Sequence, residues 1–125
     1  MLTIFGELRS LKNSKQIICR GRRPIMVSSS AYRAWEKSAI LQLKSQWQSE
    51  PISVPCWVKV RTFFGTARML DFDNMLAGVF DVLEKAGVVK NDRLIACVDG
   101  SRREVDRKNP RVEIEVKPLS KGGGK

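Results

Sequence analysis

The segment from Asp71 to Asp92 constrains the fold of this chain more than any other feature. Behind Asp73, apolar side chains recur at helical spacing, at Leu76, Val79, Phe80 and Leu83. Asp73 is suited to cap the start of such a helix, and Gly87 is suited to the left-handed exit. The pattern therefore predicts a helix over about 74–86, with acidic residues at both ends of the segment.

Helix and strand dimensions predict that the acids at the two ends meet. A helix rises 1.5 Å per residue and carries the chain about 20 Å away from Asp73. An extended return over 87–92 covers about 20 Å back, which brings Asp92 level with Asp71 and Asp73. In an extended segment Asp71 and Asp73 share a face, while Phe72 points away. Carboxylate oxygens suit Mg²⁺ or Mn²⁺, so the sequence predicts a metal site of Asp71, Asp73 and Asp92.

Each of these acids also has a plainer interpretation when it is taken alone. Asp73 is then an ordinary helix cap, and Asn91-Asp92 an ordinary turn. Because the helix and the extended return cover about the same distance, we favour the metal site over the cap and the turn. Asp81 and Glu84 lie off the apolar stripe, and Asp81 pairs with Lys85 at i, i+4. We interpret Asp81 and Glu84 as solvated helix charges that take no part in chemistry.

Composition limits the chemistry further. The 125-residue chain has a formal charge of +10 and no histidine, which excludes Ser-His and Cys-His nucleophile pairs and zinc sites that need imidazole. Cys19, Cys56 and Cys97 lack disulfide or zinc spacing, and we expect buried, reduced thiols. We find no membrane span or signal segment and expect a cytoplasmic protein with no membrane partner and no small-molecule substrate.

The remaining elements predict one α+β domain over residues 1–120, followed by a flexible Gly/Lys tail over 121–125. A long helix follows Ser28-Ser29-Ser30 and ends at Glu50-Pro51. Its apolar stripe comprises Tyr32, Trp35, Ala39, Leu43 and Trp47. Strands are expected at 2–8, 17–19, 24–27, 54–64, 94–98 and 112–116, with the second and third forming a loose hairpin. The expected fold is a mixed β-sheet backed by two helices.

The long strand has two unlike faces. Trp57, Lys59, Arg61 and Phe63 alternate with apolar residues, giving one basic and aromatic face. Such a face can follow a phosphate backbone, but an ordinary exposed sheet face or a dimer contact explains it equally well. The large positive charge favours a nucleic-acid partner. The basic residues expected to contact DNA are Lys12, Lys15, Arg20, Arg22, Arg23, Lys59, Arg61, Arg68, Lys90 and Arg93.

Several segments resemble the RusA-like Holliday-junction resolvases. The resemblance is most specific in Asp71-Phe72-Asp73-Asn74, in 81–87 and in 88–95, and weaker matches at 11–15 and 108–114 extend it over most of the chain. It implies a homodimeric endonuclease of bacterial or phage origin that acts in recombination and repair. Such an enzyme cuts four-way DNA junctions by paired symmetric nicks with Mg²⁺ or Mn²⁺.

By this resemblance Asp71, Asp73 and Asp92 are the catalytic, metal-binding acids. The chain departs from the family at two positions: Ala77 stands where many members have a functional lysine, and Asn91 replaces the first acid of an Asp-Asp pair. Arg68, Lys90 or Arg93 are candidates for supplying the missing positive charge. We expect metal ions to polarise the phosphate and activate a water, so that no histidine base is needed.

Two alternatives stay open. Asp99 with Glu115 and Lys117 matches the acid and Glu-x-Lys pattern of restriction-type nucleases, although Glu115 is more simply explained as a solvent-facing strand residue. A non-catalytic protein that binds branched DNA is the other alternative, and Ala77 is the residue that favours it.

Overall fold

The computed structural model describes residues 1–10, 15–20, 23–28 and 30–119, and the side chains of 1–10 and 30–119. Among these residues, none of the helices has the length and apolar character needed to cross a membrane. The elements, in chain order, are β1 (Leu2–Phe5), β2 (Lys15–Arg20), β3 (Arg23–Ser28), α1 (Ser30–Gln46), β4 (Cys56–Phe64), α2 (Phe72–Lys85), the 3₁₀ turn η1 (Asp92–Leu94), β5 (Ile95–Cys97), β6 (Arg102–Val105) and β7 (Arg111–Pro118).

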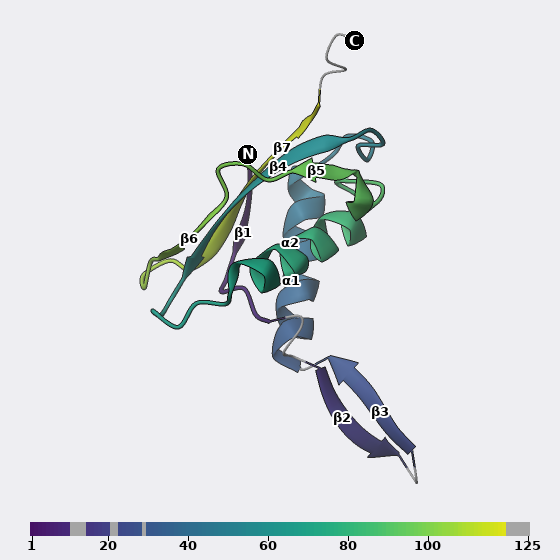
Figure 1. Cartoon of the computed structure of the whole chain (residues 1–125), viewed down its shortest axis with the longest axis vertical. Coiled ribbons are helices and arrows are strands. Elements are labelled where there is room, and N and C mark those ends of the chain that lie inside the picture. Colours follow the sequence, from purple (N-terminus) through teal and green to yellow (C-terminus); the bar gives the residue numbers. More distant parts are fainter. Residues whose placement is uncertain (11–14, 21–22, 29, 120–125) are drawn as a thin grey trace.

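The five-stranded sheet is mixed, as predicted. Its strand order is β1-β7-β4-β5, and β6 pairs with a later stretch of β4. β7 runs antiparallel to β1 and β4, whereas β5 and β6 run parallel to β4. β2 and β3 form the predicted hairpin as a separate antiparallel pair. Figure 1 shows α1 and α2 on one side of the sheet, which confirms the α+β class with two helices.

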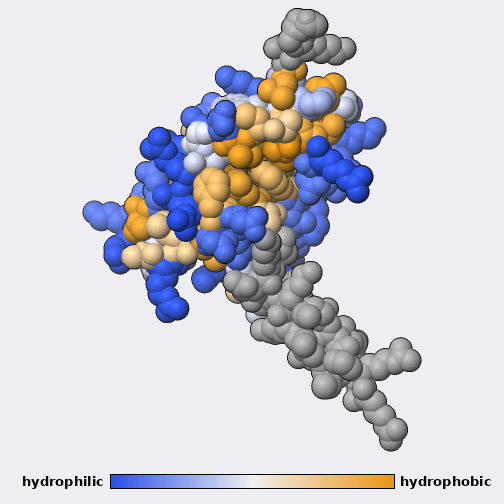
Figure 2. All heavy atoms as spheres, viewed as in Figure 1, coloured by the Kyte–Doolittle hydropathy of each residue, from blue (hydrophilic) through white to orange (hydrophobic). Residues whose placement is uncertain are grey.

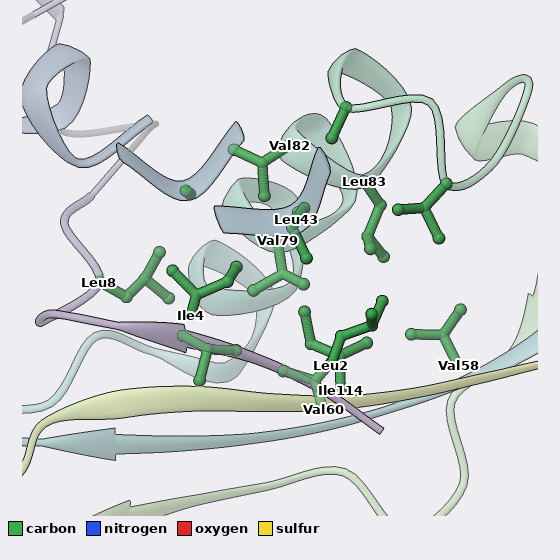
Figure 3. Close-up of a cluster of buried hydrophobic side chains, with 14 of the residues drawn as sticks. Leu2, Ile4, Leu8, Leu43, Val58, Val60, Val79, Val82, Leu83 and Ile114 are labelled. Carbon is green, nitrogen blue, oxygen red and sulfur yellow. The ribbon is translucent and has the colours of Figure 1, made fainter. Parts of the chain in front are cut away.

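The core fills the space between β4 and the two helices. Cys56, Val58 and Val60 on one face of β4 are fully buried, while Trp57, Lys59 and Arg61 on the other are partly exposed. The inward side chains of β4 meet apolar residues from both helices, and Figure 3 shows Val58, Val60, Leu43, Val79, Val82 and Leu83 converging there. The strict alternation along β4 therefore fixes which face of the sheet carries the helices.

α1 covers the free edge of β1 with two glutamines one turn apart. Gln42 bonds both the N–H and the C=O of Phe5, at 2.7 and 3.0 Å, and Gln46 bonds both groups of Thr3, at 2.8 and 2.7 Å. The two side chains act as a substitute for a neighbouring strand. This satisfies an edge that would otherwise be open to pairing with another chain.

The predicted boundaries differ from the observed ones at chain reversals. β1 ends at Phe5, not at residue 8, because Gly6 adopts φ 111° and turns the chain. α2 begins at Phe72, two residues before the predicted start. The predicted α1, β4, β5 and β7 are all present, and β6 was not predicted. The tail 121–125 lies outside the described residues.

Candidate active site

Asp71, not Asp73, caps α2. The backbone of Asp71 is extended, at φ −65° and ψ 161°, and its Oδ1 accepts a 2.7 Å hydrogen bond from the N–H of Asn74. Asp73 lies in the first helical turn. The expectation that Asp73 caps the helix and shares an extended segment with Asp71 is therefore wrong, because a cap must precede the turn whose N–H groups it accepts from.

The return from α2 brings Asp92 to the side of the helix, and not level with its start. Gly87 takes the predicted left-handed conformation, at φ 79°, and the N–H of Val88 bonds back to Leu83 at 2.9 Å. Part of the return is therefore a tight turn, so the segment covers less distance than a fully extended one. The N–H of Asp92 donates to Oε1 of Glu84 at 2.9 Å, about three turns beyond Asp73. The expected level arrival is wrong in this respect.

Asp73 and Asp92 nevertheless line one pocket. This pocket, of about 420 Å³, runs along α2 and combines three carboxylates with three apolar side chains. Its lining residues are Asp73, Leu76, Ala77, Phe80, Asp81 and Asp92. Figure 2 shows apolar residues gathered at the centre of this view, where α2 lies in Figure 1, with hydrophilic residues around them. We call this hollow the acid pocket.

Asp81 lines the acid pocket, and its carboxylate is also held by two neighbouring side chains. The hydroxyl of Tyr32 in α1 donates to its Oδ2 at 2.7 Å, and Nζ of Lys85 lies 3.2 Å from the same oxygen. The predicted pair with Lys85 is confirmed. The description of Asp81 as a solvated charge is wrong, because its side chain is 25% exposed and lines the pocket.

The surroundings of Asp81 favour its ionised form. Burial by itself would raise the pKa of Asp81, but hydrogen bonds with Glu36, Tyr32 and Lys85 outweigh it and hold that pKa below its usual value. Burial and the bond with Asp81 raise the pKa of Glu36, although Lys85 opposes this.

Glu84 is exposed, as predicted, and it also positions Asp92. Its carboxylate accepts a hydrogen bond from the N–H of Asp92 and so fixes the start of η1, a role that the sequence did not indicate. Asn91 caps the same turn by accepting from the N–H of Arg93 at 2.8 Å. The replacement of an acid by Asn91 thus keeps a side-chain oxygen at the cap position.

The acid pocket supplies hard oxygen donors, the ligand type that Mg²⁺ and Mn²⁺ prefer. Within the described ranges, no three Asp, Glu, Cys or His side chains form a group arranged to hold a metal ion. Asp71 is not among the lining residues, and one of its oxygens accepts the helix N–H. Of the three predicted metal ligands, Asp73 and Asp92 therefore line the acid pocket and Asp71 does not.

The basic residues predicted to contact DNA fall into three groups. The first comprises Lys12, Lys15, Arg20, Arg22 and Arg23, whose side chains lie outside the described part of the structure. In the second, Lys59 pairs with Glu115 at 3.0 Å and Arg61 with Glu104 at 2.9 Å. The third comprises Arg68, Lys90 and Arg93, which are exposed and have no carboxylate within ion-pair distance among the described side chains.

The outer face of the sheet is neutralised by its own ion pairs. Arg61 and Arg111 lie over the ring of Phe63, at 5.2 and 3.8 Å from its centre, and Arg111 also pairs with Glu113 at 2.9 Å. Phe63 is 7% exposed, so it is covered and not available for stacking. This face consequently offers fewer unpaired cations than its sequence indicates.

Glu115, from the alternative nuclease pattern, lies on this outer face. Its ion pair with Lys59 lowers its pKa, and Lys117 lies over the ring of Trp57 at 5.5 Å. Asp99 is exposed in the turn after β5. Since β4 and β7 separate Glu115 from the helices, the structure places this glutamate on the face opposite the acid pocket.

Two of the cysteines are described, and they differ in burial. Cys56 is fully buried, as predicted, and burial raises the pKa of its thiol. Cys97 is only partly buried, contrary to the prediction, because β5 is a short strand at the edge of the sheet. Both are free thiols.

Two further contacts at the start of α2 were not apparent from the sequence. Asn74 is 2% exposed, and its amide donates to the hydroxyl of Ser10 at 2.8 Å. Nη1 of Arg103 in β6 donates to the carbonyl of Leu70 at 2.9 Å. The Asn that directly follows Asp-x-Asp was a signal for the first, whereas nothing in the local sequence signals the second.

Fold and site together define a small α+β protein of strongly basic charge with a carboxylate-lined pocket along its second helix. The family model described as "Endodeoxyribonuclease RusA" matches residues 11–117. A protein of Aquifex aeolicus (strain VF5), named "Crossover junction endodeoxyribonuclease RusA", is 36% identical over 85 residues, which cover 68% of this chain and 67% of that protein. The chain belongs to the RusA family of endodeoxyribonucleases, which confirms the resemblance seen in the sequence.

Proposed function

We propose that this chain is a metal-dependent endodeoxyribonuclease that resolves four-way DNA junctions, with the acid pocket as its cutting site. The observation that carries the site is the convergence of Asp73 and Asp92, nineteen positions apart in sequence, in one pocket on α2. Family membership supports the substrate, because the Aquifex relative is named for crossover junctions.

Asp71, Asp73 and Asp92 are the proposed metal-binding residues. Their oxygens fit Mg²⁺ or Mn²⁺ in donor type. When bound, such an ion supplies charge to polarise the scissile phosphate and to lower the pKa of an attacking water. The chain's own part is to hold the acids: Asp71 through the N–H of Asn74, and Asp92 through Glu84. Asp81 adds an ionised carboxylate at the back of the pocket.

The proposed substrate carries dense negative charge, which the chain's +10 balances. Lys90 and Arg93, near the end of the return segment, have no carboxylate partner among the described side chains and are suited to phosphate contacts beside Asp92. We propose a two-fold homodimer, because two related sites would nick two strands of a junction that itself has approximate two-fold symmetry. A monomer in light scattering at micromolar concentration would contradict paired nicking.

A direct test uses a four-way junction and a linear duplex of the same sequence, each with and without Mg²⁺. Wild type is expected to cut the junction in Mg²⁺ and to leave the duplex intact. Asp73→Asn keeps the size of the side chain but removes its charge, so it is expected to bind the junction without cutting it. Glu115→Ala, on the opposite face of the sheet, is expected to cut as wild type does.

Two outcomes would contradict the proposal. Wild type that binds junctions and cuts in neither Mg²⁺ nor Mn²⁺ would indicate a non-catalytic DNA-binding protein, the function that Ala77 in the pocket favours. Loss of cutting in Glu115→Ala with full activity in Asp73→Asn would place the site on the outer face of the sheet.

A further inference from the structure

Among the described residues that line the acid pocket there is no lysine or arginine. Three carboxylates and three apolar side chains line it, and Ala77 is one of the three apolar residues. A DNA phosphate that approaches these carboxylates meets like charge, which the proposed metal ion and a positive side chain at the rim would both offset. Lys85 on the same helix is already paired with Asp81 and Glu36, so a further positive side chain at the rim would come from another element.

Arg103 makes a described contact with the residue directly before the segment from Asp71 to Asp92. Its Nη1 donates to the carbonyl of Leu70 at 2.9 Å, and this carbonyl is bonded directly to the nitrogen of Asp71. The contact links β6 to the start of α2 across 33 positions of the chain. The guanidinium of Arg103 therefore lies next to Asp71. By contrast, no described side-chain contact joins Arg68, Lys90 or Arg93 to Asp71 or Asp92.

Most of the binding capacity of Arg103 is not used by this contact. A guanidinium has five N–H donors, and the hydrogen bond to Leu70 uses one of them. The side chain is exposed, and among the described residues no carboxylate lies within ion-pair distance of it. Its other donors make no hydrogen bond to a described residue, and a guanidinium presents its donors in a planar fork that suits phosphate oxygens.

The neighbouring Arg102 differs in the way a control requires. It has the same charge and exposure, but successive strand residues point to opposite faces. Arg103 is paired in register with the buried Thr62, on the face that carries the helices, and Arg102 with Arg61 on the outer face. Only Arg103 is therefore directed toward α2.

We propose that Arg103 binds a non-bridging oxygen of a DNA phosphate at the rim of the acid pocket and so supplies the positive charge that Ala77 leaves out. This inference rests on the proposed function, because it assumes that DNA is cut in the acid pocket. The hydrogen bond from Arg103 to Leu70 holds the guanidinium beside Asp71 in the absence of DNA. If Arg103 did no more than bond to Leu70, its role would be purely structural. The proposed role also needs its positive charge, which contacts the phosphate.

Three variants separate the two roles: Arg103→Gln, Arg103→Lys and Arg102→Gln. Single-turnover cutting of a four-way junction in Mg²⁺ is measured for each, together with the dependence of junction binding on salt in metal-free buffer. Arg103→Gln retains an amide donor and loses the charge, while Arg103→Lys retains the charge. We expect Arg103→Gln to cut at least tenfold more slowly than wild type, Arg103→Lys to recover most of this loss, and Arg102→Gln to stay within about twofold.

The salt dependence gives a readout that a structural role would not change. Each phosphate contact contributes about one unit to the slope of log affinity against log salt, so Arg103→Gln should reduce this slope by about one relative to Arg103→Lys. The comparison of Lys with Gln holds even if both variants lose some stability. Equal cutting and equal slopes for Arg103→Lys and Arg103→Gln would overturn the proposal, whereas failure of wild type to cut would overturn the proposed function itself.

Discussion

The hydroxyl of Tyr32 in α1 donates a 2.7 Å hydrogen bond to Oδ2 of Asp81 in α2, and so links the helix pair to the back of the acid pocket. Tyr32 is 1% exposed and is the single tyrosine of the chain. Burial raises the pKa of Tyr32 well above its ordinary value, and the bond and charge of Asp81 raise it further.

The titration of Tyr32 is the first prediction. An unfolded tyrosine ionises at about pH 10, while folded Tyr32 keeps its proton at that pH. Above about pH 10 the unfolded chain therefore binds fewer protons, and the free energy of unfolding should fall as pH rises, with the full contribution present below that pH. Absorbance at 295 nm should show tyrosinate only as the protein unfolds. In Asp81→Asn the pKa of Tyr32 should move down, and a wild-type transition near pH 10 in folded protein would contradict the contact.

The hydrogen bond from Asp92 to Glu84 gives a second prediction. Glu84→Ala removes the acceptor of the N–H of Asp92 and should loosen η1, slowing junction cutting about tenfold or more. Glu84→Gln keeps an oxygen acceptor and should cut nearly as wild type does. Because Glu84 is exposed, the free energy of unfolding should change by only about 0.5 kcal/mol in either variant. Equal rates for the two variants would show that Glu84 does not position Asp92.

The glutamines on the β1 edge give a third prediction, on stability. Replacing Gln42 and Gln46 together with alanine removes four hydrogen bonds to Phe5 and Thr3. The affected backbone groups are part-exposed, so we expect a loss of about 1 to 2 kcal/mol in the free energy of unfolding, measured with urea. Gln48→Ala is the control, because the side chain of Gln48 bonds to the carbonyl of Ser45 and makes no hydrogen bond to β1 among the described residues. Identical midpoints for the double variant and this control would contradict the edge-covering role.

Charge pairing on the sheet gives a fourth prediction. Lys59 is neutralised by Glu115, whereas Lys90 and Arg93 have no carboxylate partner among the described side chains. Lys90→Gln and Arg93→Gln should each weaken junction binding and reduce its salt slope by about one, and Lys59→Gln should change both less. Fluorescence anisotropy over a salt series measures this. A larger effect for Lys59→Gln would favour the outer face of the sheet as the DNA surface.

Elements with a strong period were predictable from sequence. The alternation along β4 indicates a single buried face, and β4 appears with that face inward. The predicted stripe of α2 is confirmed in part: Val79 and Leu83 are fully buried, whereas Leu76 and Phe80 are partly exposed and line the acid pocket. β6 was missed because Arg102-Arg103-Glu104-Val105 has no buried face to produce alternation. Its place depends on pairing with β4, which is a tertiary contact.

The candidate site was predictable only to the extent that helix and strand dimensions determine it. Helix and strand rise brought Asp73 and Asp92 to one pocket, but the turn at Gly87 shortened the return and left Asp92 beside Glu84. The contact of Arg103 with Leu70 depends on how β6 docks. Spacing in the sequence carries no information about such a contact.

The most direct test of the central claim is single-turnover cutting of a four-way junction in Mg²⁺ by Asp92→Asn beside Asp99→Asn. Both changes remove one exposed carboxylate, but only Asp92 lines the acid pocket. We predict that Asp92→Asn binds junctions with wild-type affinity in metal-free buffer and cuts at least about 100-fold more slowly, while Asp99→Asn cuts at the wild-type rate. Wild-type cutting by Asp92→Asn, or loss of cutting in Asp99→Asn alone, would contradict the account.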